Sequence, residues 1–222
     1  MQVIPHTPHK PLVTRTPFDQ MSNLSNLDRL KEALEKDKPE SQLFQEECKE
    51  LKLKVKRAVS TLFTDFRFGV REQMSIQLIL SGGSISSLYH GENVKDYDFW
   101  CRDSKDIHPL TIILRDEAKD IIMDDTGPEY GDIFEATGFH ESPNAITLKN
   151  RMQLITLSDY ERARSVFDFI HCMPYYDLHS DRLYISMEQW RLIKSKRLVR
   201  QHLTIEPSSH RVAKYKERGW KI

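Results

Sequence analysis

The sequence predicts a protein of the α/β (α+β) class, in which a small mixed sheet is flanked by helices and followed by a C-terminal helical segment. Two observations support this. Short apolar runs bounded by Gly, Pro, Asn or Asp are typical of buried strands, and longer segments with apolar residues at three- and four-residue steps are typical of amphipathic helices. The 222 residues are 39% hydrophobic and 30% charged, enough for one large domain or two small ones.

The N-terminal part is predicted to be a tail followed by two helices. Residues 1–24 show no periodicity and lack the apolar stretch of a signal peptide. Apolar residues at helical spacing predict a short helix over Asn26–Glu35 and a long one from Glu40 to about Phe66. Pro39 favours the start of the second helix.

The central part is predicted to alternate strands and helices. A buried strand precedes a glycine turn, a short helix closed by Gly91 follows, and a second strand leads to a helix opened by Pro109. In chain order, these elements are expected at Ser75–Leu80, Ser84–Tyr89, Lys95–Cys101 and Pro109–Met123.

The last third is predicted to open with a hairpin around Lys149 and Asn150. Capping boxes at Ser158/Glu161 and Ser186/Gln189 each indicate the start of a helix. The hairpin strands are expected at Ala145–Leu148 and Gln153–Leu157, further strands at Ser165–Cys172 and Arg182–Ile185, and a helix from Ser186 to about His202. Ser208 or Ser209 is expected to cap a last helix that stops at Gly219.

We therefore expect four parts: a tail over 1–24, N-terminal helices over 25–66, a central core over 67–186 and a basic helical segment over 187–222. The three cysteines form no CxxC pair, so we expect buried thiols of a cytoplasmic protein rather than a zinc site. No apolar run is long enough to span a membrane.

Charge is unevenly distributed along the chain. From Arg182 to the end there are eleven Lys or Arg and three acidic residues, so this segment carries +8 while the whole chain is neutral. Arg211, Lys214, Tyr215 and Arg218 share one face of the last predicted helix. Such a face fits NTP phosphates or a nucleic-acid backbone, although a solvated surface paired with the acidic remainder explains any single residue as well.

A glycine turn follows the first predicted strand. Gly82 and Gly83 allow the backbone to turn tightly and approach a phosphate without a Cβ in the way. Ser84 then stands at the start of a helix, where free N–H groups and the helix dipole favour an anion. Alone, this motif is a common turn, and its meaning depends on what lies beside it.

Two carboxylates follow at a spacing of two. Because side chains alternate along a strand, Asp96, Asp98 and Trp100 share one face, and Tyr97 and Phe99 share the other. Neighbouring carboxylates repel each other, and a divalent cation such as Mg²⁺ or Mn²⁺ removes that cost. Two such cations can stabilise the attacking and leaving oxygens of a phosphoryl displacement.

Two metal ions usually require a third carboxylate. Asp168 is the strongest candidate, because aspartate is disfavoured inside a strand and here stands between two phenylalanines. Its alternative role is a buried ion pair with an arginine. Asp125 and Asp177 are weaker candidates in predicted loops, His171 is expected to be a core histidine, and His90 could approach a substrate.

These residues resemble the nucleotidyltransferase superfamily that includes DNA polymerase β, most closely the head domain of bacterial poly(A) polymerases and tRNA CCA-adding enzymes. That head reads GG-x-V-R-D-x-L-x-G and then D-x-D; this chain matches it without a gap from Gly82 to Gly91 and then at Asp96–Asp98. The resemblance implies a nucleotidyltransferase-type fold, phosphate contact by Gly83 and Ser84, metal ligation by Asp96 and Asp98, and a third aspartate on a later strand, which suits Asp168.

The family's Arg-Asp pair is replaced here by Ser86 and Ser87, and the chain is shorter than the tRNA enzymes. It looks like a compact stand-alone nucleotidyltransferase of the kind found in bacteriophages. We expect it to transfer NMP from an NTP to a hydroxyl, with an RNA 3′ end as the first candidate acceptor because of the basic segment. The alternatives are a degenerate nucleotide- or RNA-binding regulator and an enzyme that modifies a protein. The preferred NTP, the number of nucleotides added and the oligomeric state do not follow from the sequence.

Overall fold

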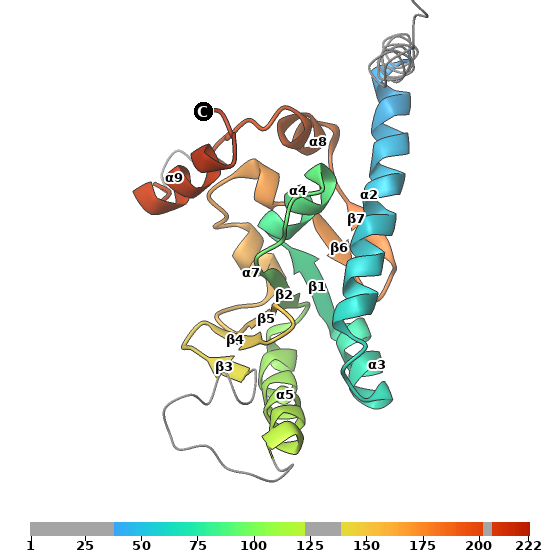
Figure 1. Ribbon diagram of the computed structural model, residues 1–222, viewed down its shortest axis with the longest axis vertical. Helices are drawn as coiled ribbons and strands as arrows, with labels where there is room; N and C mark the ends of the chain where they lie inside the picture. Colours follow the sequence, from blue (N-terminus) through green and yellow to red (C-terminus); the bar gives the residue numbers. More distant parts are fainter. Residues whose placement is uncertain (1–37, 123–138, 202–205) are drawn as a thin grey trace, which may run out of the picture. The chain divides into compact units, whose positions relative to one another are not determined.

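The computed structural model describes residues 38–122, 139–201 and 206–222 (Figure 1). The tail, the helix expected over Asn26–Glu35 and Asp125 lie outside these ranges. The chain divides into two compact units, Met1–Leu43 and Phe44–Ile222, and the sheet belongs to the second. The four-part division expected from the sequence stays a prediction.

The second unit contains a mixed seven-stranded sheet, as the sequence predicts, in the order β3-β4-β5-β2-β1-β6-β7. Among the described strands, β2 and β5 pair in parallel and the other neighbours are antiparallel. The strands are β1 (Leu78–Ser81), β2 (Tyr97–Cys101), β3 (Phe139–Glu141), β4 (Ala145–Leu148), β5 (Met152–Ile155), β6 (Tyr175–Asp177) and β7 (Arg182–Tyr184).

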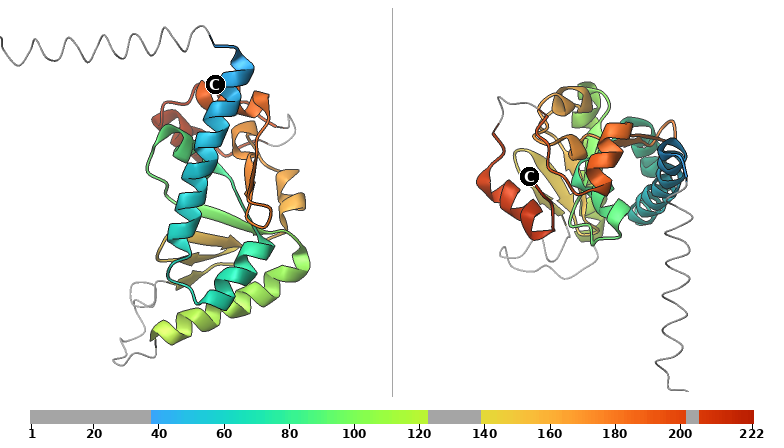
Figure 2. Two further views of the ribbon diagram at one scale, coloured as in Figure 1. Left: turned by 90° about the vertical axis from the view of Figure 1, so that its right-hand side faces the viewer. Right: turned by 90° about the horizontal axis from the view of Figure 1, so that it is seen from above.

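The helices and 3₁₀ turns connect these strands. They are α2 (Glu40–Leu62), α3 (Phe68–Gln77), α4 (Gly83–His90), η1 (Ser104–Asp106), α5 (Ile107–Ile122), α7 (Tyr160–Arg164), η2 (Ile170–Cys172), α8 (Met187–Lys194) and α9 (Ser209–Glu217). The second unit's part of α2 and the whole of α9 lie on opposite sides of the sheet (Figures 1 and 2). In the described parts of the chain, no helix combines the length and apolarity needed to cross a bilayer.

The main core lies on the face of the sheet that α2, α3 and α5 cover. Leu51, Val55, Met74, Phe99 and Leu110 are almost fully buried there. Phe99 points into this core, whereas its neighbours Asp98 and Trp100 do not belong to it, so the alternation predicted for β2 is confirmed. The opposite face of β2 is therefore free to carry polar side chains.

A second, smaller cluster holds the C-terminal segment in place. It consists of Phe169, Cys172, Ile193, Leu198, Tyr215 and Trp220. His171 is buried beside it, with its ring 4.0 Å from that of Trp220. Burial lowers the pKa of His171 to about 3, so this histidine is neutral and belongs to the core, as expected.

Several local predictions are confirmed. The hairpin of β4 and β5 forms, and Ser186 and Gln189 make both hydrogen bonds of a capping box. Ser208 caps α9, and Gly219 follows its end with a φ of +80°. Cys101 and Cys172 are buried as expected, whereas Cys48 is only half-buried.

The strand predicted over Ser75–Leu80 begins later than expected. Residues 75–77 belong to α3, because Val70 and Met74, one helical turn apart, pack into the core while Ile76 stays 50% exposed. Similarly, α5 begins two residues before Pro109. The cap of α7 is Asp159, which accepts a hydrogen bond from the backbone N–H of Arg162, and not Ser158.

The prediction of a strand over Ser165–Cys172 is wrong. The open edge of β1 is occupied by β6, so 165–172 follows a turn and the short helix η2 instead. Phe169 forms only an isolated bridge with Arg200, and the Asp168 carbonyl accepts from the N–H of Gln201. Asp168 therefore reaches the site from a loop.

The helix predicted to end at His202 ends at Lys194. Lys196 has a φ of +49°, and Leu198 is buried with its N–H bonded to the carbonyl of Lys221. Packing of this segment against the C-terminus therefore outweighs the helical pattern. Arg197 and Arg200 consequently lie outside the helix in which they were expected.

Candidate active site

The glycine turn lies between β1 and α4 and is tied to η2. The Gly82 N–H donates to the carbonyl of Cys172 at 3.2 Å. Gly82 has a φ of +99°, and a Cβ at this position would lie 2.8 Å from Oδ2 of Asp98. Both the backbone conformation and the nearby carboxylate therefore require glycine here.

The first turn of α4 is open to a ligand. Gly82 supplies no side-chain cap, and the Oγ of Ser84 is buried without a hydrogen-bond partner among the described residues. Ser86 and Ser87, by contrast, both donate to the carbonyl of Gly83 at 2.9 Å. Ser84 thus has a hydroxyl free to meet an anion at a helix N-terminus.

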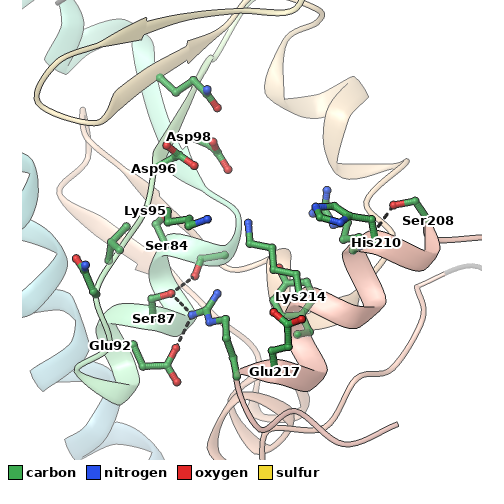
Figure 3. A pocket seen from close by; sticks show the side chains of 17 residues that line it. Ser84, Ser87, Glu92, Lys95, Asp96, Asp98, Ser208, His210, Lys214 and Glu217 are labelled. Atoms are coloured by element: carbon green, nitrogen blue, oxygen red, sulfur yellow. Dashed lines mark hydrogen bonds and ion pairs between the residues drawn. The ribbon is translucent and has the colours of Figure 1, made fainter. Parts of the chain in front are cut away.

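Asp96 and Asp98 stand beside this turn. Asp98 lies on β2, Asp96 precedes the strand, and their side chains lie next to each other on one wall of a cavity (Figure 3). Burial raises the pKa of Asp98 to about 6, and the charge of Asp96 adds to this shift, while Arg211 and Lys214 oppose it. The carboxylate pair is therefore costly without a counter-charge.

A cavity of about 840 Å³ separates this wall from α9. Its lining includes Gly83, Ser84, Asp96 and Asp98 on one side and His210, Arg211, Lys214, Tyr215 and Arg218 on the other. Lys214 extends from α9 into the space (Figure 3). Neither Lys214 nor Lys95, which also lines the cavity, makes a hydrogen bond or ion pair to another residue described by the structure.

Tyr215 fixes α9 against the glycine turn. Its hydroxyl lies 3.2 Å from the Sγ of Cys172, and a Cβ on Gly83 would lie 3.2 Å from the same hydroxyl. Its ring makes edge contacts with Phe169 and Trp220. The absence of a side chain at Gly83 thus favours the close approach of α9, and Tyr215 acts as a packing residue at the base of the cavity.

Arg218 is already engaged at one end of the cavity. Its guanidinium bonds to the hydroxyl of Ser87 at 2.6 Å and pairs with Glu92, which also holds the ammonium of Lys196. Ser87 occupies the position of the aspartate in the GG-x-V-R-D-x-L-x-G pattern that this segment resembles. The predicted phosphate contact of Arg218 stays a prediction, and its present contacts are structural.

Arg211 and Asp168 form an ion pair with 2.7 Å between Nε and Oδ2. Oδ1 of Asp168 is buried and has no partner among the described residues. This pairing is the alternative role considered for Asp168 from the sequence. The sequence also placed Asp177 in a loop, but it lies on β6 and pairs with Arg102 away from the cavity.

The fit of a divalent cation differs between the carboxylates. Asp96 and Asp98 offer adjacent hard oxygens whose repulsion a cation would relieve, and Gly82 keeps the space beside Asp98 open. Asp168 holds an arginine instead. The described residues include no group of three or more His, Cys, Asp or Glu arranged to hold a metal ion. The pair fits a cation, and metal ligation by Asp168 stays a prediction.

Some lining residues were not singled out from the sequence. Lys95, His210 and Gln153 reach the cavity from three separate segments. Lys95 directly precedes the carboxylate pair, which was the available signal, whereas the position of His210 depends on how α9 packs. His90, considered as a substrate contact, instead bonds the carbonyl of Ile193 through Nε2 at 2.9 Å.

Three solved structures are distantly similar in fold. A tRNA-processing enzyme with CTP gives a TM-score of 0.40 at 14% identity over 60% of this chain and 35% of its own. A CCA-adding enzyme in apo form I gives 0.35 at 13%, and the Thermotoga maritima CCA-adding enzyme complexed with tRNA gives 0.36 at 14%, each over 65% of this chain and 36% of its own. The chain thus spans about a third of the length of these proteins.

No curated protein matches the sequence. Residues 49–196, however, match a family described as Gabija anti-defense 2, or Gad2. The matched segment covers well over half of the chain, from α2 to the end of α8, and includes the glycine turn, both aspartates and Asp168. The chain therefore belongs to the Gad2 family of Gabija anti-defense proteins.

Proposed function

We propose that this protein is a nucleotidyltransferase that transfers NMP from an NTP to a hydroxyl group and releases pyrophosphate. The observation that supports it most is the shared cavity: the start of α4, which has no side-chain cap, the Asp96/Asp98 pair and Lys214 all line one space. The ammonium of Lys214 has no ion-pair partner among the described residues. A triphosphate needs anion donors and a cation-binding carboxylate pair side by side.

The residues have distinct roles in this proposal. Ser84 and the backbone of Gly82 and Gly83 would receive the phosphates, with Lys214 approaching from the opposite wall. Asp96 and Asp98 would hold Mg²⁺ or Mn²⁺, which when bound neutralises phosphate charge and polarises the phosphorus. Asp168, through its unpaired Oδ1, would accept the proton of the attacking hydroxyl.

Arg211 has two possible tasks in the same cycle. While it pairs with Asp168, it fixes the position of that carboxylate beside the second wall of the site. Its guanidinium also lines the cavity, and a bound phosphate would compete for it. Arg218 would reach phosphate only by leaving Glu92 and Ser87.

The family name points to the biological purpose. We propose that nucleotidyl transfer by this chain counters the Gabija defence. The RNA 3′ end favoured by the charge of the C-terminal segment stays a candidate acceptor, but much of that charge is neutralised internally, as Lys194, Lys196, Arg200, Arg211 and Arg218 all pair with carboxylates.

Two assays test this proposal together. The protein is incubated with each NTP radiolabelled at the α-phosphate, with Mg²⁺ or Mn²⁺, total RNA and total protein, beside the Asp96→Ala/Asp98→Ala variant. In parallel, cells carrying Gabija and either form of the protein are challenged with a virus that the defence excludes. We expect label transfer and viral growth with the wild type only. Viral growth that survives the double substitution would show that anti-defence needs no transfer.

A second candidate is a nucleotide-binding regulator without turnover. It is favoured by the Asp168–Arg211 pair and by the absence, in the described residues, of a three-ligand metal cluster. Pyrophosphate release separates the two, because both candidates show a thermal shift with NTP and metal and both lose it in Asp96→Asn/Asp98→Asn. Only the enzyme releases pyrophosphate.

A further inference from the structure

The cavity between the Asp96/Asp98 pair and α9 is called the nucleotide cavity below. A second cavity, of about 500 Å³, adjoins it. The two share Asp98, Gln153, Ser208 and Arg211, so Asp98 and Arg211 stand between them. Asp168 lines only the second cavity. If the proposed function holds, a hydroxyl bound there faces the nucleotide site from the side of Asp168.

One part of the wall of this second cavity is apolar and aromatic. It includes Trp100, Ile155, Val166 and Phe167, and the rings of Trp100 and Phe167 meet edge to face at 5.8 Å. Val166 is 58% exposed at this site although it is a large apolar residue. Such walls suit a ring or an apolar group on the acceptor.

The charge of the second cavity opposes a polyanion. Among the described residues lining it, Arg211 is the one cation, and it is paired with Asp168, while Asp98 and Glu206 add negative charge. The nucleotide cavity, in contrast, presents Lys95 and Lys214, which pair with no carboxylate in the part of the chain that the structure describes. A nucleic-acid strand would bring phosphates to the wall with no free counter-charge, which electrostatics disfavours.

Two residues that line this cavity, Trp100 and Asp168, each carry a buried polar atom without a hydrogen-bond partner among the described residues. The Nε1–H of Trp100 is a donor, and Oδ1 of Asp168 is an acceptor. A phenolic hydroxyl both accepts and donates a hydrogen bond and carries its own aromatic ring. It is the side-chain hydroxyl that matches both the apolar walls and the unpaired atoms.

We propose that the second cavity is the acceptor site and that the acceptor is a tyrosine side chain of a polypeptide. The phenolic oxygen attacks the α-phosphorus and forms the new P–O bond. The bond from the α-phosphorus to the bridging oxygen breaks, pyrophosphate leaves with its electron pair, and the phenolic proton passes to Asp168. This inference rests on the proposed nucleotidyl transfer and names its substrate class.

The test uses the full chain, α-labelled NTP, Mn²⁺ and three acceptors: a peptide library with a central Tyr, the same library with Phe in its place, and an RNA pool. We expect label on the Tyr library only, as a phosphodiester located on tyrosine by mass spectrometry. Val166→Lys should raise KM for the Tyr library by about tenfold, because it places a charge on an apolar wall, without changing NTP affinity. Leu157→Lys is the control, since Leu157 is similarly exposed but lines neither cavity.

The outcomes separate the two claims. Label on RNA or on both libraries equally overturns the tyrosine acceptor and leaves nucleotidyl transfer standing. Val166→Lys and Leu157→Lys behaving alike overturns the location of the acceptor. No label on any acceptor and no pyrophosphate release overturns both claims.

Discussion

Gly82 lies so close to Asp98 that a Cβ on the glycine would stand 2.8 Å from Oδ2 of the carboxylate. The turn that would receive phosphate and the carboxylate that would bind metal are thus in direct contact. A side chain introduced at Gly82 should therefore displace the carboxylate of Asp98.

Gly82→Ala should destabilise the fold by about 1–3 kcal/mol, through strain at positive φ and displacement of Asp98. It should also abolish the metal-dependent thermal shift with NTP. Two matched glycines separate the causes in chemical denaturation. Gly91→Ala, at φ +66° with open space, should show strain alone, and Gly69→Ala, inside α3 with nothing within 4 Å, should be neutral or stabilising. A full metal-dependent shift in Gly82→Ala would contradict the proposed geometry.

Lys214→Ala should weaken NTP binding by about tenfold, because it removes an unpaired cation from the cavity. Lys216→Ala is the control, since it lies on the same helix but does not line the cavity. Equilibrium binding of a fluorescent NTP measures both. Equal losses in the two variants would mean that the general charge of α9, and not a directed contact, binds the nucleotide.

The Arg211–Asp168 pair should contribute about 1 kcal/mol to stability, a modest value because the Arg211 side chain is 47% exposed. Arg211→Gln, Asp168→Asn and the double variant form a cycle that isolates this term. In labelling assays, Asp168→Asn should reduce transfer far more than NTP binding. Unchanged transfer would exclude Asp168 as the proton acceptor.

His171 should make the protein less stable as the pH falls below neutrality. Its folded pKa is lowered to about 3 while the unfolded chain binds the proton near the ordinary value of 6.5. The contribution of His171 to the free energy of unfolding is therefore fully present above pH 6.5. It is lost between pH 6.5 and pH 3, by at most about 1.4 kcal/mol per pH unit.

Chemical denaturation at pH 7.5 and pH 5.5 measures this pH dependence. In His171→Gln, the difference in unfolding free energy between the two pH values should be smaller, even if the variant is less stable at each pH. The raised pKa of Asp98 acts with the opposite sign, but it is present in both proteins and cancels in the comparison. Identical pH dependence in the two proteins would mean that His171 protonates in the folded state.

The local pattern was sufficient for the elements of the site that lie close together in sequence. The shared face of Asp98 and Trp100 follows from the alternation of side chains along a strand. The bounds of α4 follow from the glycine turn before it and from Gly91 after it. Each of these signals depends on neighbouring residues alone. The hairpin of β4 and β5 and the caps Ser186 and Ser208 were predictable for the same reason.

Sequence reasoning failed where distant segments compete for one place. The edge of β1 could accept 165–172 or β6, and the structure gives it to β6, so Asp168 comes from a loop and meets Arg211. Likewise, α8 stops at Lys194 because Leu198 is buried with its N–H bonded to the Lys221 carbonyl. Both outcomes depend on burial and pairing across long stretches of sequence, which no local period encodes.

By itself, then, the sequence determined the α/β class, the pairing of Asp96 with Asp98 and the glycine turn beside them. Each of these follows from the spacing of residues that are close together in the chain. Only the tertiary structure decided that α9 closes the cavity through Tyr215, that Arg218 is held by Glu92, and that Asp168 opens onto a second cavity. These relations arise from the packing of residues far apart in the chain, where side-chain shape and charge select one arrangement among many.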